Sequence, residues 1–162
     1  MQHQGILAVI SGFSGAGKGT VMKALLEQYD NYALSVSATT REPRPGEANG
    51  REYFFVSEQE FTSMIEKGDL IEYARYVNHY YGTPKAYVES MLAAGKDVLL
   101  EIEIQGALKV KQQFPEALLV FIVPPSAAEL KNRLLSRGTE SEDVIEKRLS
   151  RAAEEAEGMS SY

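Results

Sequence analysis

The order of the apolar runs along the chain predicts an α/β protein built on a parallel sheet. Residues 6–10, 97–103 and 117–123 are short apolar runs with the length and β-branched content of buried strands. Helix-compatible segments at 21–27, 84–94 and 106–114 follow or separate them. Strands that alternate with helices in this way usually form a parallel sheet, and its carboxyl edge lines a ligand crevice.

A different pattern interrupts this alternation between residues 37 and 84. A predicted strand at 32–37 runs into a loop at 38–51 that contains prolines, glycines and three arginines. The segment that follows is predicted to be mostly antiparallel and therefore to form an insertion on the α/β body. Its predicted elements are a strand at 53–56, a helix at 57–68 opened by a Ser57–Glu60 capping box, and strands at 70–77 and 79–83 around a tight turn.

Two helices are predicted near the end of the sequence. Ser126 begins the first, which runs to about Ser136, and the second starts at Ser141 or Glu142. An apolar stripe on the second helix is formed by Val144, Ile145, Leu149, Ala152 and Ala156, with Lys147, Arg148 and Arg151 alongside. A glycine-containing, arginine-rich elbow joins the helices, as a closing lid requires. A plain helical hairpin with solvated charges is the alternative.

Length, net charge and amino-acid composition exclude several classes of protein. A chain of 162 residues is long enough for one well-buried core, and its net charge of -6 argues against a nucleic-acid-binding surface. Any basic cluster in this acidic background therefore indicates a local site. There are no cysteines and no apolar run of membrane-spanning length, so a cytoplasmic protein without a membrane segment is expected.

The stretch Gly12-Phe13-Ser14-Gly15-Ala16-Gly17-Lys18-Gly19-Thr20 indicates nucleotide chemistry. It lies between a predicted strand and a predicted helix, where glycines let backbone N–H groups approach phosphates and the helix N-terminus adds positive charge. Lys18 is expected to reach the terminal phosphates. Gly19 departs from the G-x-x-x-x-G-K-[ST] pattern because the nearest hydroxyl, on Thr20, comes one position later. A glycine-rich turn without a ligand is the alternative.

Two further features carry charge suited to a phosphate-transfer site. Arg41 and Arg44 lie in a loop fixed by proline and glycine, and arginine binds phosphate oxygens in a fork, so they are a candidate clamp for an acceptor phosphate. The alternative is a solubilising basic loop. Glu101 and Glu103 end a predicted parallel strand two residues apart, so we expect them at the edge that carries the glycine loop.

The ordered motifs resemble those of the guanylate kinase family over essentially the whole chain. The resemblance includes Ser35 to Phe55, Leu70-Ile71-Glu72-Tyr73-Ala74, Asn78 to Pro84, the acidic strand end before Gln105-Gly106, and Arg137-Gly138-Thr139-Glu140. It implies a P-loop α/β fold with an antiparallel GMP-binding insertion and a helical lid. It also implies transfer of the terminal phosphoryl group of ATP to GMP, and to dGMP, with Mg²⁺. The implied regions are a core at 1–36 and 84–125, the insertion at 37–83 and the lid at 126–158.

Site residues follow from the resemblance position by position. The implied ATP ligands are Ser14, Gly15, Ala16, Gly17, Lys18, Gly19, Thr20 and Arg133. Arg41, Arg44, Tyr53 and Tyr81 are implied for the GMP phosphate, and Ser37, Glu72, Thr83 and Glu103 for guanine. Lys18, Arg41, Arg137 and Arg148 are the implied catalytic residues, and Thr20 and Glu101 the implied Mg²⁺ residues.

The chemistry of guanine agrees with this assignment, because its N1–H and amino group present two donors that a carboxylate such as Glu72 can accept. A salt-bridge role for Glu72 and a structural role for Glu103 remain alternatives. Two other functions stay open, namely a kinase of another nucleoside monophosphate and a non-catalytic module that binds phosphorylated peptides. The family is also expected to continue past Tyr162 with a strand, an Asn-Asp segment and a helix. The sequence does not indicate an oligomeric state.

Overall fold

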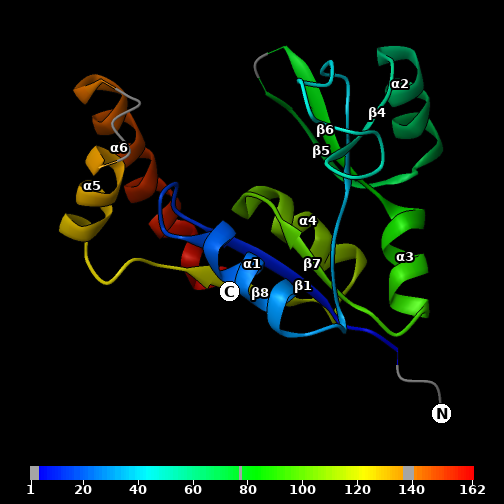
Figure 1. Cartoon of the computed structure of the whole chain (residues 1–162), viewed down its shortest axis with the longest axis horizontal. Coiled ribbons are helices and arrows are strands. Elements are labelled where there is room, and N and C mark those ends of the chain that lie inside the picture. Colours follow the sequence, from blue (N-terminus) through cyan, green and yellow to red (C-terminus); the bar gives the residue numbers. More distant parts are fainter. Residues whose placement is uncertain (1–3, 77, 137–140) are drawn as a thin grey trace.

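The computed structural model describes residues 4–76, 78–136 and 141–162 and contains a fully parallel core sheet (Figure 1). Its strand order is β2-β7-β1-β8, and every neighbouring pair is parallel. This confirms the predicted parallel sheet, and its edge strand β2 is the first half of the strand predicted at 32–37. The strands are β1 (Leu7–Gly12), β2 (Tyr32–Leu34), β7 (Asp97–Glu101) and β8 (Leu118–Ile122).

Helices cover both faces of this sheet because alternate residues of its strands are buried on opposite sides. Val9 and Val98 pack with α3 (Lys85–Ala93) and α4 (Ile104–Gln113) on one face. Ile10 and Leu99 pack with α1 (Lys18–Gln28) on the other. With both faces buried, the central strands β1 and β7 read as continuous apolar runs, which is the pattern from which they were predicted.

A second sheet of order β4-β3-β6-β5 stands beside the core (Figure 1). The pairs β3–β6 and β5–β6 are antiparallel as predicted, whereas β4 runs parallel to β3, so the insertion is a mixed sheet. Helix α2 (Glu58–Lys67) packs on it through the fully buried Phe61, and the predicted Ser57–Glu60 capping box is present. The strands are β3 (Ser37–Thr39), β4 (Tyr53–Phe55), β5 (Leu70–Tyr76) and β6 (His79–Pro84).

The strand predicted at 32–37 is in fact two strands that belong to different sheets. Its first half, β2, pairs with β7, and the Ser35 N–H still donates to the carbonyl of Leu99 in the core sheet. The chain then passes Val36 and enters β3 of the second sheet. A pattern of apolar and small residues cannot show this change of partner, because both halves have the same period.

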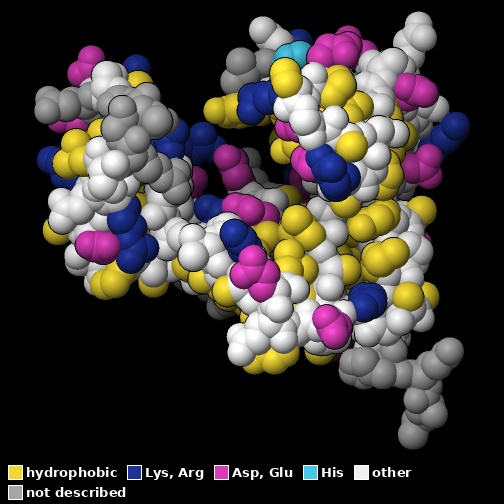
Figure 2. All heavy atoms as spheres, in the orientation of Figure 1, with side chains coloured by type: hydrophobic (Ala, Val, Ile, Leu, Met, Phe, Trp, Pro, Cys, Tyr) yellow, Lys and Arg dark blue, Asp and Glu magenta, His cyan; other side chains and the backbone are white. Residues whose placement is uncertain are grey.

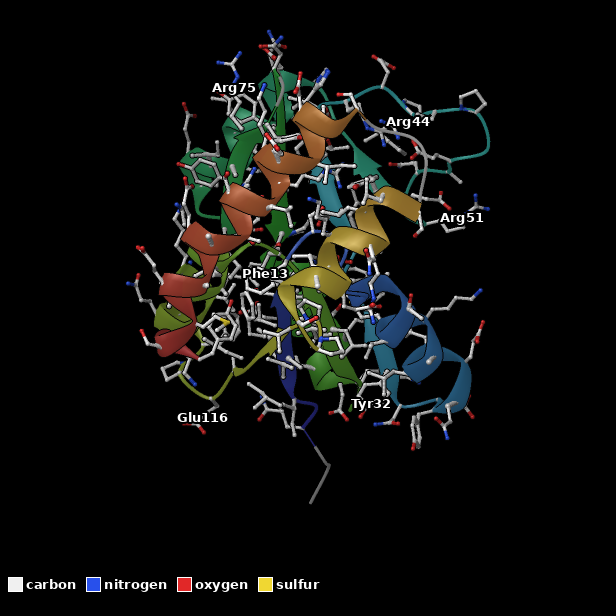
Figure 3. The ribbon with its side chains drawn as sticks, turned by 90° about the vertical axis from the view of Figure 1, so that its left-hand side faces the viewer. Phe13, Tyr32, Arg44, Arg51, Arg75 and Glu116 are labelled. Carbon is white, nitrogen blue, oxygen red and sulfur yellow. The ribbon has the colours of Figure 1, made fainter. Side chains whose placement is uncertain are left out.

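Helices α5 (Ala127–Ser136) and α6 (Glu142–Glu157) form a third body, followed by a short 3₁₀ helix at Gly158–Ser161. They pack on the glycine loop around Phe13, which lies beneath the pair in Figure 3. Ile145, Leu149, Ala152 and Ala156 of the predicted stripe join this cluster. Val144 does not, and is 38% exposed. No helix in the described parts of the chain is long and apolar enough to cross a membrane.

Candidate nucleotide site

The glycine loop between β1 and α1 has the backbone that its sequence predicts. Gly17 precedes α1 with φ of 103°, in the left-handed region that a side chain disfavours. Gly12 has no room for a side chain, because a Cβ there would lie 2.3 Å from the carbonyl oxygen of Ile122 on β8. These glycines therefore hold the loop tight against the sheet and turn it into the N-terminus of α1.

Lys18 is the first residue of α1 and folds back over the loop. Its Nζ donates to the carbonyl oxygens of Gly12 at 2.8 Å and Phe13 at 3.3 Å, and lies 3.9 Å from Glu101 Oε1. The first turn of α1 is fully described and contains no acidic residue, so the positive end of the helix is not neutralised locally. The loop, the lysine and the helix terminus together have the geometry and charge suited to an anion.

Two arginines from the helical pair reach this loop. Arg133 of α5 donates to the carbonyl oxygen of Ala16 at 3.1 Å and is paired with Glu129 at 2.7 Å. Arg148 of α6 donates to Ser14 Oγ at 2.8 Å. The structure thus brings Arg133, implied as an ATP ligand, and Arg148, implied as catalytic, to the predicted phosphate loop, and Arg137 lies outside the described residues.

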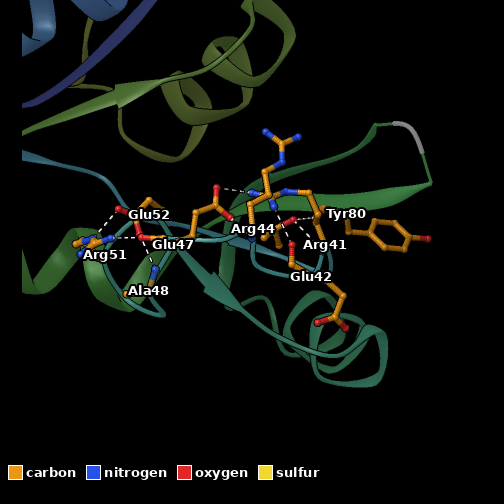
Figure 4. A network of polar contacts seen from close by, with 10 residues as sticks. Arg41, Glu42, Arg44, Glu47, Ala48, Arg51, Glu52 and Tyr80 are labelled. Carbon is orange, nitrogen blue, oxygen red and sulfur yellow. Dashed lines mark hydrogen bonds and ion pairs between the residues drawn. The ribbon is translucent and has the colours of Figure 1, made fainter.

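The arginine loop after β3 is held by one carboxylate. Glu47 accepts from Arg41 Nη2 at 2.9 Å and from the Arg44 backbone N–H at 2.7 Å, as Figure 4 shows. The hydrogen bond to Arg41 is the main reason that the pKa of Glu47 is lowered, and the same bond raises the pKa of Arg41. Both groups are therefore charged, and the loop is ordered around this ion pair.

Aromatic rings surround the Arg41 guanidinium. Its central carbon lies 5.3 Å from the ring centre of Tyr53 and 5.7 Å from that of Phe55, within cation–π range. The Tyr53 and Tyr81 rings meet edge to face at 6.0 Å. Three of the four residues predicted for the acceptor phosphate, Arg41, Tyr53 and Tyr81, therefore form one cluster. Arg44 is exposed in the same loop.

Glu72 is a buried carboxylate with one hydroxyl partner. It is 8% exposed, and Thr83 Oγ1 donates to its Oε1 at 2.7 Å. Burial raises the pKa of Glu72, while the Thr83 hydrogen bond and the charge of Lys109 oppose that rise. The salt-bridge alternative is not what the structure shows, because a threonine hydroxyl and no cation contacts this carboxylate within the described residues. Thr83 is itself fully buried, so this hydrogen bond is shielded from water.

Two clefts adjoin at the carboxyl edge of the core sheet, where Figure 2 shows a hollow between the α5–α6 pair and the second sheet. The donor cleft, about 590 Å³, is lined by Ser14, Lys18 and Arg148. The acceptor cleft has the same volume of about 590 Å³ and is lined by Ser37, Glu72 and Tyr81. Six residues line both clefts, namely Tyr53, Tyr76, Glu101, Ile102, Glu103 and Arg151.

The residues predicted for Mg²⁺ suit a cation that arrives with a nucleotide. Glu101 ends β7 with its side chain 43% exposed beside Lys18, and Thr20 is exposed in the first turn of α1. The described residues contain no group of three or more His, Cys, Asp or Glu that could hold a metal ion. One carboxylate and one hydroxyl fit Mg²⁺, which protein sites bind through few side chains together with phosphate oxygens and water.

Some site residues were not predicted from the sequence. Glu47 orders the arginine loop, and Arg151 of α6 donates to Glu103 Oε1 at 2.6 Å across the junction of the clefts. Gly106 leaves room for Glu72, since a Cβ there would lie 3.2 Å from its Oε2. Glu47 was noted only inside the Ser35–Phe55 motif and Arg151 only beside the apolar stripe, and neither was given a role, because charges on loops and amphipathic helices are usually solvated. Gly106 was noted only as part of the Gln105-Gly106 motif.

Comparison with known proteins agrees with this geometry. The guanylate kinase family model matches residues 4–162. The guanylate kinase of Caldanaerobacter subterraneus subsp. tengcongensis is 56% identical over 162 residues, covering 100% of this chain and 79% of that protein. The guanylate kinase of Bacillus subtilis is 53% identical over 163 residues, covering 100% and 80%.

A solved structure extends the likeness to the fold. The crystal structure of guanylate kinase from Anaplasma phagocytophilum has a TM-score of 0.72 and 32% sequence identity to this chain, and the match covers 100% of this chain and 76% of that one. The phosphate loop, the adjoining acceptor cleft and the helical pair thus occur together in a chain that matches the family from end to end. The protein belongs to the guanylate kinase family.

Proposed function

We propose that this protein transfers the terminal phosphoryl group of ATP to GMP, giving ADP and GDP. The observation that carries the proposal is the junction of the two clefts, where the same residues line the donor side beside Lys18 and the acceptor side beside Glu72. Two nucleotides bound in adjoining clefts can meet at their phosphates. Phosphoryl transfer depends mainly on such positioning and on charge stabilisation.

The donor side would be formed by the loop from Ser14 to Thr20. Its backbone N–H groups and Lys18 would bind the ATP phosphates, and Arg133 and Arg148 would add positive charge from the helical pair. Lys18 already lies over the loop, so phosphate oxygens would replace the carbonyl oxygens that it now contacts. A catalytic contribution from Arg137 stays a prediction.

Magnesium would be held beside this loop by Glu101 and Thr20, partly through water. When bound, Mg²⁺ neutralises charge on the transferring phosphate. Lys18 and the arginines would orient the phosphates so that an acceptor oxygen attacks the terminal phosphorus as its bond to ADP breaks. No side chain has to act as a strong base in this step, because an ionised phosphate oxygen is the nucleophile.

The acceptor side would bind both the phosphate and the base of GMP. Arg41, Arg44, Tyr53 and Tyr81 would bind its phosphate. Glu72 and Glu103 would accept from the N1–H and amino donors of guanine, and Ser37 would donate to O6. Adenine lacks this donor pattern, so it would leave the buried Glu72 unpaired, which is costly.

A coupled assay with ATP and Mg²⁺ tests the proposal across GMP, dGMP, AMP, CMP and UMP. We expect GMP and dGMP to be phosphorylated at much higher kcat/KM than the other three, and chelation of Mg²⁺ to abolish the reaction. Equal rates with AMP would contradict guanine recognition.

A cytoplasmic location also stays a prediction, which fractionation of the source cells tests.

A further inference from the structure

Arg151 of α6 is the cation that stands where the donor and acceptor clefts meet. Its Nη2 donates to Glu103 Oε1 at 2.6 Å, and its Nε lies 3.3 Å from Glu155 Oε1. Arg151 and Glu103 line both clefts. One guanidinium thus connects a helix of the α5–α6 pair to a carboxylate on the core at the point where the two nucleotides would meet.

Glu103 is free to make this contact because its side chain does not cap its own helix. It occupies the position before α4, where a carboxylate commonly accepts from the first-turn N–H groups, and it has no such hydrogen bond. Ser57, in the same position before α2, does form the capping bond. The carboxylate of Glu103 is instead directed toward α6.

Arg151 also separates two carboxylates that repel each other. Burial raises the pKa of Glu155, the charge of Arg151 lowers it, and the charge of Glu103 raises it again. Without the guanidinium between them, Glu103 and Glu155 would face each other as like charges, and the more exposed Glu103 would turn away. Arg151 therefore fixes the direction of the Glu103 side chain.

The contact leaves Glu103 able to bind a ligand. Arg151 uses Nη2 for Glu103 and Nε for Glu155, so among the described residues the ion pair engages only Oε1 of Glu103. A carboxylate has two acceptor oxygens, and Oε2 remains available for the donors of a base. The ion pair is exposed, with side-chain accessibilities of 53% for Arg151 and 67% for Glu103, so it adds little to folding stability.

The same face of α6 also reaches the donor loop. Arg148 lies three residues before Arg151, so the two side chains are neighbours on the helix surface. Arg148 contacts Ser14 in the donor loop, and Arg151 contacts Glu103 in the acceptor cleft. One turn of α6 thus contacts both halves of the site.

We propose that Arg151 is a positioning residue for the acceptor base, which holds the Glu103 carboxylate toward the bound guanine while linking α6 to the acceptor cleft. The inference rests on the proposed GMP kinase activity. It assigns Arg151 no contact with the reacting atoms, because it acts through Glu103. Its loss should therefore weaken GMP recognition more than ATP binding.

Steady-state kinetics of R151Q, R151K and the control K147Q test this proposal. Lys147 is an exposed cation on the same helix, so K147Q removes the same charge from α6 without touching Glu103. We expect R151Q to raise the KM for GMP about threefold to fivefold, with KM for ATP and melting temperature close to those of the wild type. R151K, which keeps the charge and loses the fork, should fall between R151Q and the wild type.

A double-mutant cycle with E103Q separates positioning from a general structural role. If Arg151 acts through Glu103, adding R151Q to E103Q should change the KM for GMP by less than about twofold. An equal effect of R151Q in both backgrounds, or an effect no larger than that of K147Q, would overturn the inference. A parallel rise in both KM values with a lower melting temperature would also overturn it. A wild-type protein inactive on GMP would instead refute the proposed function.

Discussion

The donor loop and the acceptor cleft are expected to bind their nucleotides by different means. Around residues 12–20 the shape of the binding site is formed by the backbone. Glycines lie close against neighbouring atoms, and N–H groups are available at the start of α1. Around Glu72 the shape of the site is formed by side chains on the four strands of the second sheet and on a loop ordered by Glu47. Backbone binds any phosphate, whereas side chains distinguish one base from another. Changes on the donor side should therefore affect rate, and changes on the acceptor side should affect choice of substrate.

Removal of the donor-side lysine should have the largest effect. Lys18→Ala deletes the cation expected at the transferring phosphate and should lower kcat by about 10³-fold, the scale seen when one preorganised charge-stabilising group is lost. The side chain contacts loop carbonyls and Glu101 and is not in the apolar core, so the melting temperature should change little. Rapid-quench or coupled kinetics measure the loss. Activity within tenfold of wild type would contradict the role of Lys18.

Glu72→Gln should change the selectivity for the acceptor nucleotide and leave ATP binding unaffected. Glutamine can still accept the Thr83 hydrogen bond, but it presents an amide N–H₂ toward the guanine donors, so the ratio of kcat/KM for GMP to that for AMP should fall by about 10²-fold or more. The KM for ATP should stay near the wild-type value. An unchanged GMP-to-AMP ratio would refute base recognition by Glu72.

The pKa of Glu72 makes acceptor binding depend on pH. Because burial raises this pKa above its ordinary value of 4.5, the carboxylate form expected to accept from guanine should be lost as pH falls through the raised value. The KM for GMP should therefore rise on acidification in the wild type and stay flat in the Glu72→Gln variant. KM profiles for both substrates check this, and a KM for ATP that rises in parallel would point to a different group.

The raised pKa of Glu72 should affect folding stability in the opposite direction to GMP binding as pH changes. A group whose folded pKa is raised favours the folded state most at low pH, and this contribution is lost as pH rises from 4.5 through the folded pKa. The melting temperature of the wild type relative to Glu72→Gln should accordingly fall as pH rises across that window. Glu72 should thus lower stability in the same pH range in which its carboxylate is expected to become able to bind guanine.

Gly19→Ala should give the smallest effect, and it should be stabilising. Gly19 lies in the first turn of α1, and a Cβ there would meet no atom within 4 Å. Alanine in a helix is favoured over glycine by about 0.5–1 kcal/mol, so thermal or urea unfolding should show a gain of that size. A loss of stability would mean that the loop backbone depends on glycine at this position too.

Several parts of the molecule could be predicted from sequence because their signals are local. The strand–loop–helix context placed Lys18, the Ser57–Glu60 spacing gave a capping box, and the carboxylates after 97–100 indicated the ligand edge of the sheet. Long-range features could not be predicted in this way. The division of 32–37 between two sheets depends on partners far along the chain, and so does the parallel pairing of β4 with β3.

The candidate site divides in the same manner. Positions inside ordered motifs, such as Arg41 and Glu72, could be named in advance. The residues that hold the site side chains in place could not. The contact of Arg151 with Glu103 joins residues 48 positions apart, and nothing in either local pattern indicates it. The family resemblance carried many of the individual assignments, and their roles in binding stay predictions.

The arginine loop contains an anion of its own. Glu47 already accepts from Nη2 of Arg41, a side chain expected to meet the GMP phosphate, and from the backbone N–H of Arg44. An incoming anion must compete with this resident counter-ion or share the guanidinium with it. Singly charged buffer anions should compete poorly, while a doubly charged phosphate carried by a base that binds elsewhere in the cleft has the advantage of two attachments. Glu47 should therefore weaken the binding of common anions to the arginine loop.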